Sequence, residues 1–100
     1  MTVYHVVLFK LKPNVSKTTL TEWAAQGAAM VGKIPGLIKF DANTPLPATA
    51  HRTQGYEMGV VAILEKPEDI PVYADHPAHL EIAKLGREFS TETLAYDLEF

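Results

Sequence analysis

The stretch TVYHVVLFKL at residues 2–11 predicts a β-strand with two apolar faces. Alternate side chains of a strand point to opposite sides of the sheet. One face of this strand carries Val3, His5, Val7, Phe9 and Leu11, and the other carries Tyr4, Val6 and Leu8. A second stretch, GYEMGVVAIL at 55–64, is apolar on both faces in its second half. Strands of this kind are usually buried on both sides.

Working outward from these two strands, the sequence predicts six further segments. Helical spacing of apolar residues and a capping serine indicate the first helix, and prolines suited to a helix start indicate the others. The segments are a helix at 17–33 capped by Ser16, a strand at 36–42, a loop at 43–54, a short helix starting at Pro67 and bent or shortened by Pro71, a helix from Pro77 to about Gly86, and a strand at 93–100.

The order strand, helix, strand, strand, helix, strand predicts an α+β, ferredoxin-like β-α-β-β-α-β protomer. Its four-stranded antiparallel sheet would carry both helices on one face. The other face would then expose a large apolar patch, which a second copy of the chain would cover. We therefore expect a homodimer, a dimeric α+β barrel, whose two sheets enclose a pocket for a small apolar molecule.

Composition limits the classes of function. The chain has 100 residues, 47% of them hydrophobic and 21% charged, which fits one globular domain over residues 1–100. Its net charge of −3 and scattered basic residues give no sign of nucleic-acid or membrane binding. There is no cysteine, which excludes disulfides and thiol nucleophiles. We expect a cytoplasmic protein with no leader and no membrane span.

Polar groups that can carry chemistry are densest in VYADHPAH at 72–79. His79 lies just inside a helix start, where the helix dipole disfavours a protonated imidazole, so it suits a general base. Tyr73 lies just before the helix break and could donate a hydrogen bond to a carbonyl oxygen. His5 interrupts an apolar strand face, so it should be paired or line a wet cavity.

Each of these residues also has a purely structural interpretation. Tyr73 and His79 could simply bridge helix and sheet, and His5 could be a satisfied core histidine. His76, before Pro77, suits a helix cap. His76 and His79 are three residues apart, but zinc needs a third protein ligand and none is near in sequence. We therefore expect no metal, and no cofactor motif is present either.

Five segments together resemble the stress-responsive A/B barrel (Dabb) family. They are HVVLFKLKPNVS at 5–16, GL-x-x-F at 36–40, GYEMGVVAILE at 55–65, YADHPAHLE at 73–81 and YDLEF at 96–100. The resemblance covers nearly the whole chain, in one order. It implies a ferredoxin-like protomer, two of which form a β-barrel.

Many members of this family are known only as stress-induced proteins. One plant member is a polyketide cyclase that closes an aromatic ring by aldol condensation. Its catalytic histidine and tyrosine fall on His79 and Tyr73, and its first-strand histidine falls on His5. That cyclase has aromatic residues where this chain has Ala24 and Gly27, which implies a roomier or differently shaped pocket.

The leading hypothesis is a cofactor-independent polyketide cyclase, a lyase-type enzyme. Tyr73 would hydrogen-bond a substrate carbonyl and His79 would take an α-proton. The residues expected to line the substrate site are His5, Val7, Ala24, Gly27 and His76. The alternative is a stress-responsive or ligand-binding protein without turnover. A haem-containing or flavin-free monooxygenase shares this architecture in other families, but no signature for it is present.

Overall fold

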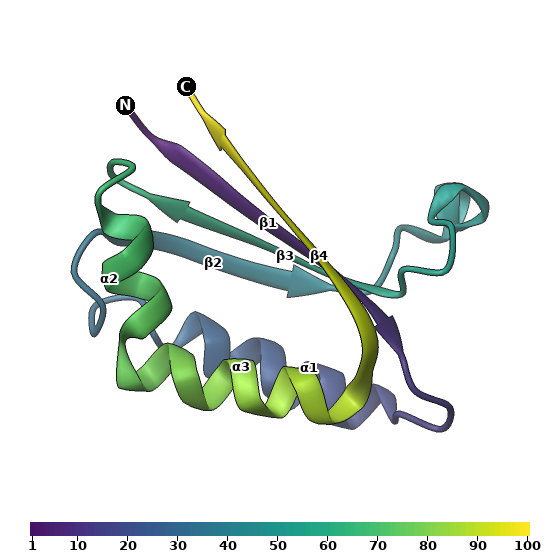
Figure 1. Ribbon diagram of the computed structural model, residues 1–100. Coiled ribbons are helices and arrows are strands. Elements are labelled where there is room, and N and C mark those ends of the chain that lie inside the picture. Colours follow the sequence, from purple (N-terminus) through teal and green to yellow (C-terminus); the bar gives the residue numbers. More distant parts are fainter.

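The computed structural model describes residues 1–100. Its elements in chain order are β1 (Val3–Leu11), α1 (Lys17–Ala28), β2 (Leu37–Asn43), the 3₁₀ helix η1 (Pro47–Arg52), β3 (Met58–Leu64), α2 (Asp69–Asp75), α3 (Pro77–Phe89) and β4 (Ser90–Glu99). The strands form one sheet in the order β2-β3-β1-β4, and each neighbouring pair is antiparallel. All three α-helices lie on one side of this sheet (Figure 1). The predicted α+β, ferredoxin-like fold is confirmed.

The register of the sheet fixes which side chains share a face. Val6 of β1 lies opposite Val61 of β3 and opposite Tyr96 of β4. Its neighbours in sequence, His5 and Val7, point to the other face, which the helices cover. The two central strands are therefore apolar on both sides, as the sequence predicts.

The hydrophobic core lies between the sheet and the helices, and Trp23 of α1 is at its centre. The indole is 4% exposed, and its ring meets the rings of Phe9, Phe40 and Phe89 edge to face. Its Nε1–H donates a hydrogen bond of 2.9 Å to the backbone oxygen of Ile82. A buried indole N–H needs such a partner, so this bond ties α1 to α3.

The opposite face of the sheet has no cover within the chain. On β4, Leu94, Tyr96 and Leu98 are 45%, 61% and 42% exposed, and Tyr4 and Val61 on the central strands are 37% and 38% exposed. We call these five residues and their neighbours Val6, Leu8 and Ile63 the open face. A contiguous apolar surface of this kind marks an interaction site.

Helix α1 is shorter than the sequence predicts, because it ends at Ala28 rather than at residue 33. Beyond it the chain turns through tighter hydrogen bonds, such as the 3.0 Å bond from the Met30 N–H to the Gly27 oxygen. Gly32 has φ of +92°, which an α-helix cannot contain. The apolar spacing continues through this turn and explains the longer prediction.

Helix α2 begins at Asp69, two residues after Pro67. Pro71 therefore lies in the first turn, where a backbone N–H has no partner within the helix. The proline is accommodated there without breaking α2, which runs on to Asp75.

Helix α3 continues past Gly86 to Phe89, and β4 follows at once from Ser90 rather than from residue 93. A β-carbon on Gly86 would lie 3.4 Å from the Phe9 ring and 3.5 Å from the Trp23 ring. This glycine allows close packing of α3 on the core and does not end the helix.

The segment at 43–54, predicted as a loop, contains η1 and projects beyond the end of the sheet (Figure 1).

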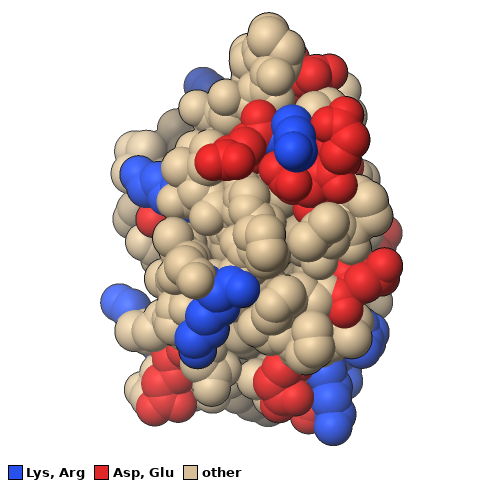
Figure 2. All heavy atoms as spheres, turned by 90° about the vertical axis from the view of Figure 1, so that its left-hand side faces the viewer, with Lys and Arg blue, Asp and Glu red and all other residues tan.

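Figure 2 shows the end of the molecule formed by α2, where acidic side chains gather in the upper part around one basic side chain. No helix of the chain has the length and apolar character needed to cross a bilayer.

Candidate functional site

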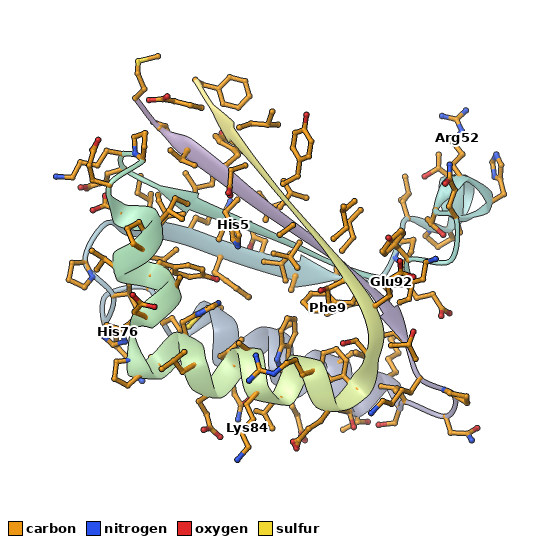
Figure 3. All side chains as sticks on the ribbon, in the orientation of Figure 1. His5, Phe9, Arg52, His76, Lys84 and Glu92 are labelled. Carbon is orange, nitrogen blue, oxygen red and sulfur yellow. The ribbon has the colours of Figure 1, made fainter.

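A cavity of about 270 Å³ lies between the helix-covered face of the sheet and α2 and α3. Eight of its twelve lining residues are hydrophobic. The other four lining residues are polar: His5 on β1, His79 and Arg87 on α3, and Thr93 on β4. Figure 3 shows His5 and Phe9 directed from β1 into the layer between sheet and helices. Polar groups thus converge on a small apolar space, which is the usual form of a small-molecule site.

Tyr73 and His79 are brought together by the corner between α2 and α3. His76 ends α2 in extended conformation, and Pro77 begins α3. The Ala78 N–H donates a 3.0 Å hydrogen bond to His76 Nδ1, which caps the new helix. The rings of Tyr73 and His79 then lie 4.3 Å apart between centroids, inclined at 41°.

The hydrogen bond made by His79 sets its tautomer. Its Nδ1 lies 3.0 Å from the backbone oxygen of Ala74. A carbonyl oxygen only accepts, so Nδ1 carries the hydrogen and Nε2 keeps a free lone pair. Burial lowers the pKa of His79, and His5 and Arg87 lower it further against the opposing hydrogen bond to Ala74. The sequence predicts the same direction from the helix dipole, whereas the first cause in the structure is burial.

Tyr73 presents a protonated phenol to the cavity. The residue is 3% exposed, and burial raises the pKa of its phenol well above the ordinary value of 10.0. The side-chain hydrogen bonds of this region involve His5, His76 and His79 but not the Tyr73 hydroxyl. Its donor is therefore free for a ligand.

His5 is paired with a carboxylate and also lines the cavity. Its Nδ1 lies 2.5 Å from Oδ1 of Asp97, which faces it directly across β1 and β4. Its ring also meets the Tyr73 ring edge to face, at 5.6 Å between centroids. Asp97, His5, Tyr73 and His79 thus form a continuous chain of contacts from the sheet edge into the cavity.

Of the other residues expected at the substrate site, some line the cavity and some do not. Val7 lines the cavity. Ala24 does not; it borders a separate small pocket beside Leu20. His76 caps α3 and is not a lining residue either, and Figure 3 shows it at the α2–α3 corner.

Of the two expectations for the pocket beside Gly27, roomier or differently shaped, the structure does not support the first, because Gly27 does not enlarge the cavity. A β-carbon at Gly27 would lie 2.1 Å from a ring carbon of Phe40. The Phe40 ring therefore occupies the space that a side chain at residue 27 would fill. It lines the cavity in its place.

The cavity that holds these side chains lies elsewhere than the pocket that the sequence predicts between two sheets, which stays a prediction. Tyr73, His79 and His5 lie on the helix-covered face, within one chain. A larger groove of about 760 Å³ lies on the open face near the segment before β3 and is lined by Leu8, Val61 and Leu94, among others. Tyr73, His79 and His5 do not line that groove, so we assign the candidate site to the smaller cavity.

Three polar residues near the site were missed by sequence reasoning. Arg87 lies eight residues after His79, a spacing that returns to the same helix face. Asp97 alternates with the apolar residues of β4, so it could have been placed on the face of His5 once the strand order was known. Nothing in the sequence singles out Thr93.

No group of three or more His, Asp or Glu side chains is arranged to hold a metal ion. His76 and His79, three residues apart, each use Nδ1 in a hydrogen bond to the backbone. The polar groups of the cavity suit proton transfer and hydrogen bonding to a carbonyl compound.

Residues 3–100 match the model of the stress responsive A/B barrel domain, Dabb. No curated protein matches the chain significantly. Among solved structures, an Arabidopsis thaliana protein is 27% identical with a TM-score of 0.85, covering 97% of this chain and 93% of its own.

Two further structures share the fold at lower identity. A dimeric ferredoxin-like protein of unknown function from Jannaschia sp. is 19% identical with a TM-score of 0.86, covering 100% of both chains. The hydroxynitrile lyase of Passiflora edulis is 19% identical with a TM-score of 0.82, covering 97% of this chain and 91% of its own.

Proposed function

The chain belongs to the stress responsive A/B barrel domain family, and from that premise we propose that it is a cofactor-independent, aldol-type cyclase of a small polyketide-like molecule. The observation that carries the proposal is the pairing of Tyr73 and His79, with ring centroids 4.3 Å apart, in a mainly apolar cavity. A free phenol donor and a neutral imidazole at one position are the two groups that enolate chemistry needs.

His79 acts as the base. Its Nε2 takes a proton from the carbon between two substrate carbonyls, and the electron pair of that C–H bond moves into an enolate. The lowered pKa keeps the imidazole neutral at neutral pH, so the lone pair is available. The bond from Nδ1 to Ala74 holds the ring in place.

Tyr73 acts as the hydrogen-bond donor. Its phenol donates to the carbonyl oxygen on which the enolate charge develops. The enolate carbon then attacks a second carbonyl of the same molecule, which forms the new C–C bond and breaks the π bond of that carbonyl. The resulting alkoxide receives the proton from His79. Atoms and charge balance without any co-reactant.

The size and the apolar walls of the cavity determine how the substrate is held. At about 270 Å³ it is near the lower end of the range for ligand pockets, roughly 300–1,000 Å³, so it suits a small molecule. Apolar walls exclude water and fold a flexible chain into a reactive shape. Orientation of this kind contributes roughly 7–11 kcal/mol in favourable cases.

We further propose that the protein is a homodimer joined through the open face. Exposed Leu94, Tyr96 and Leu98 would be buried there against a second copy. The Jannaschia protein of the same fold is described as dimeric, which supports this assembly. Each protomer would then keep a complete cavity of its own on the outer, helix-covered side of its sheet.

A non-catalytic ligand-binding or stress-protective protein is the second candidate. The burial of Tyr73, at 3% exposure, and its contacts with both His5 and His79 favour it. In that case the tyrosine serves packing, and the two imidazoles orient a ligand that leaves unchanged.

One experiment separates the two candidates. Linear poly-β-ketone chains of graded length are incubated with the protein and with the His79→Ala and Tyr73→Phe variants, and the products are separated by mass. The exposed His51→Ala is the matched control. If His79→Ala and Tyr73→Phe lose cyclisation and the control keeps it, the result supports the proposal that the protein is an enzyme. If the unchanged protein binds the chains saturably but yields only the products that form without protein, the result supports a binding protein.

A further inference from the structure

We propose that Arg87 binds a carboxylate of the ligand in the Tyr73–His79 cavity, so that the substrate class is an apolar carboxylic acid. The inference rests on the proposed function, because it concerns the same cavity. It adds the chemical class of the ligand and a specificity residue.

Arg87 is the only lining residue of the cavity with a permanent charge. No carboxylate lines the cavity beside it. The ion pairs of the chain are His5–Asp97, Lys10–Glu92 and Lys39–Asp41, so Arg87 has no acidic partner. A guanidinium at the wall of an apolar cavity, without a protein counter-charge, is suited to an anion brought by a ligand.

The position of Arg87 on α3 fixes how the ligand would lie. His79, Ala83 and Arg87 are spaced by four residues, which places them on one face of the helix. Eight residues of α-helix rise about 12 Å. The ligand would therefore extend along α3, with its anionic end at Arg87 and its reactive part at His79.

The groups near Arg87 favour a carboxylate over a more highly charged anion. One guanidinium balances one negative charge, and its fork of N–H donors matches the two oxygens of a carboxylate. Thr93 of β4 lines the same cavity and adds a hydroxyl donor.

Arg87 also acts on His79. Its charge is one of the causes that lower the pKa of the imidazole. A carboxylate bound at Arg87 would offset that charge, so the pKa of His79 should rise when an acid binds. A neutral ligand of the same shape should have no such effect.

The test uses octanoate and its neutral counterpart octanamide as probes, with dissociation constants measured by NMR titration at low salt. The unchanged protein is expected to bind octanoate about tenfold more tightly than octanamide. Arg87→Gln should remove this difference and leave octanamide binding as it was. Arg87→Lys, which keeps the charge but loses the fork, should retain part of it.

Lys84→Gln is the matched control, because it removes the same charge from the same helix on the side that points away from the sheet (Figure 3). Equal affinity for the two probes, or an octanoate preference that survives Arg87→Gln, would overturn the role of Arg87. If octanamide still perturbs the resonances of Tyr73 and His79, the proposed binding cavity stands despite that failure. If neither probe perturbs them, the ligand site itself is refuted together with the inference.

Discussion

Asp97 on β4 and His5 on β1 face each other across the sheet, with 2.5 Å between Oδ1 of the carboxylate and Nδ1 of the imidazole. A carboxylate accepts and does not donate, so Nδ1 carries the hydrogen, and in the neutral imidazole Nε2 is then the acceptor. The edge strand thereby sets the tautomer of a residue that lines the cavity.

Replacing Asp97 with alanine should release this tautomer. We expect the ¹⁵N spectrum of the His5 imidazole to change from a single Nδ1–H form to a mixture of two forms. Asp41→Ala, which removes a carboxylate paired with Lys39 on the far edge strand, should leave the spectrum unchanged. A His5 tautomer that is the same in the Asp97 variant would show that the pair does not control it.

The lowered pKa of His79 predicts how stability depends on pH. The unfolded chain takes up a proton near the ordinary value of 6.5, whereas the folded chain does so only at lower pH. The contribution to the free energy of unfolding is therefore complete above pH 6.5 and is lost as the pH falls below it. Urea denaturation between pH 7.5 and about pH 5 should show this decline, and it should be shallower in His79→Gln.

The same shift predicts the pH dependence of turnover. If His79 is the base, activity should rise with pH to a plateau, with a midpoint below 6.5. Tyr73 should not add an alkaline limb below pH 10, because burial raises the pKa of its phenol above 10.0. A midpoint above 6.5, measured on kcat/KM, would assign the titration to another group.

The contact between Gly27 and Phe40 predicts a loss of stability in Gly27→Ala. The new β-carbon would lie 2.1 Å from the ring, so either the ring or α1 must move. Overpacking of this kind costs roughly 1–3 kcal/mol, against a gain in helix propensity of up to about 1 kcal/mol. Thermal unfolding would measure the net loss. The same substitution in a Phe40→Leu background should cost less, and equal costs in both backgrounds would exclude the ring as the cause.

The open face predicts that a charge placed on it disrupts the dimer. Val61→Glu and Tyr96→Glu should each yield a folded monomer in sedimentation at micromolar concentration, because the carboxylate would have to be buried at the interface. Leu80→Glu changes a side chain that is 53% exposed on α3 and should stay dimeric. A folded monomer already present in the unchanged protein would refute the assembly.

The strands could be predicted from the sequence because their pattern is local. Alternation in 2–11 identifies β1 and both of its faces without knowledge of any contact. The pattern does not indicate which face the helices cover. Which face they cover depends on how the helical connections cross the sheet. The strand pattern alone therefore predicts a pocket between two sheets, whereas His5 lies under the helices.

The parts of the site that escaped prediction depend on contacts between distant residues. Phe40 fills the space beside Gly27, thirteen residues away, and no spacing rule connects the two positions. Tyr73 and His79 were identified because they lie close in sequence on either side of one helix break. Arg87 and Asp97 become relevant only when α3 and β4 are placed against the same cavity.

Trp23 is the only tryptophan of the chain, and it borders the cavity while its N–H is held by Ile82. The molecule therefore carries a natural fluorophore at the wall of its candidate site. A compound entering that space should alter the emission of the indole without any label, so libraries of acids and ketones can be screened optically on the unmodified protein.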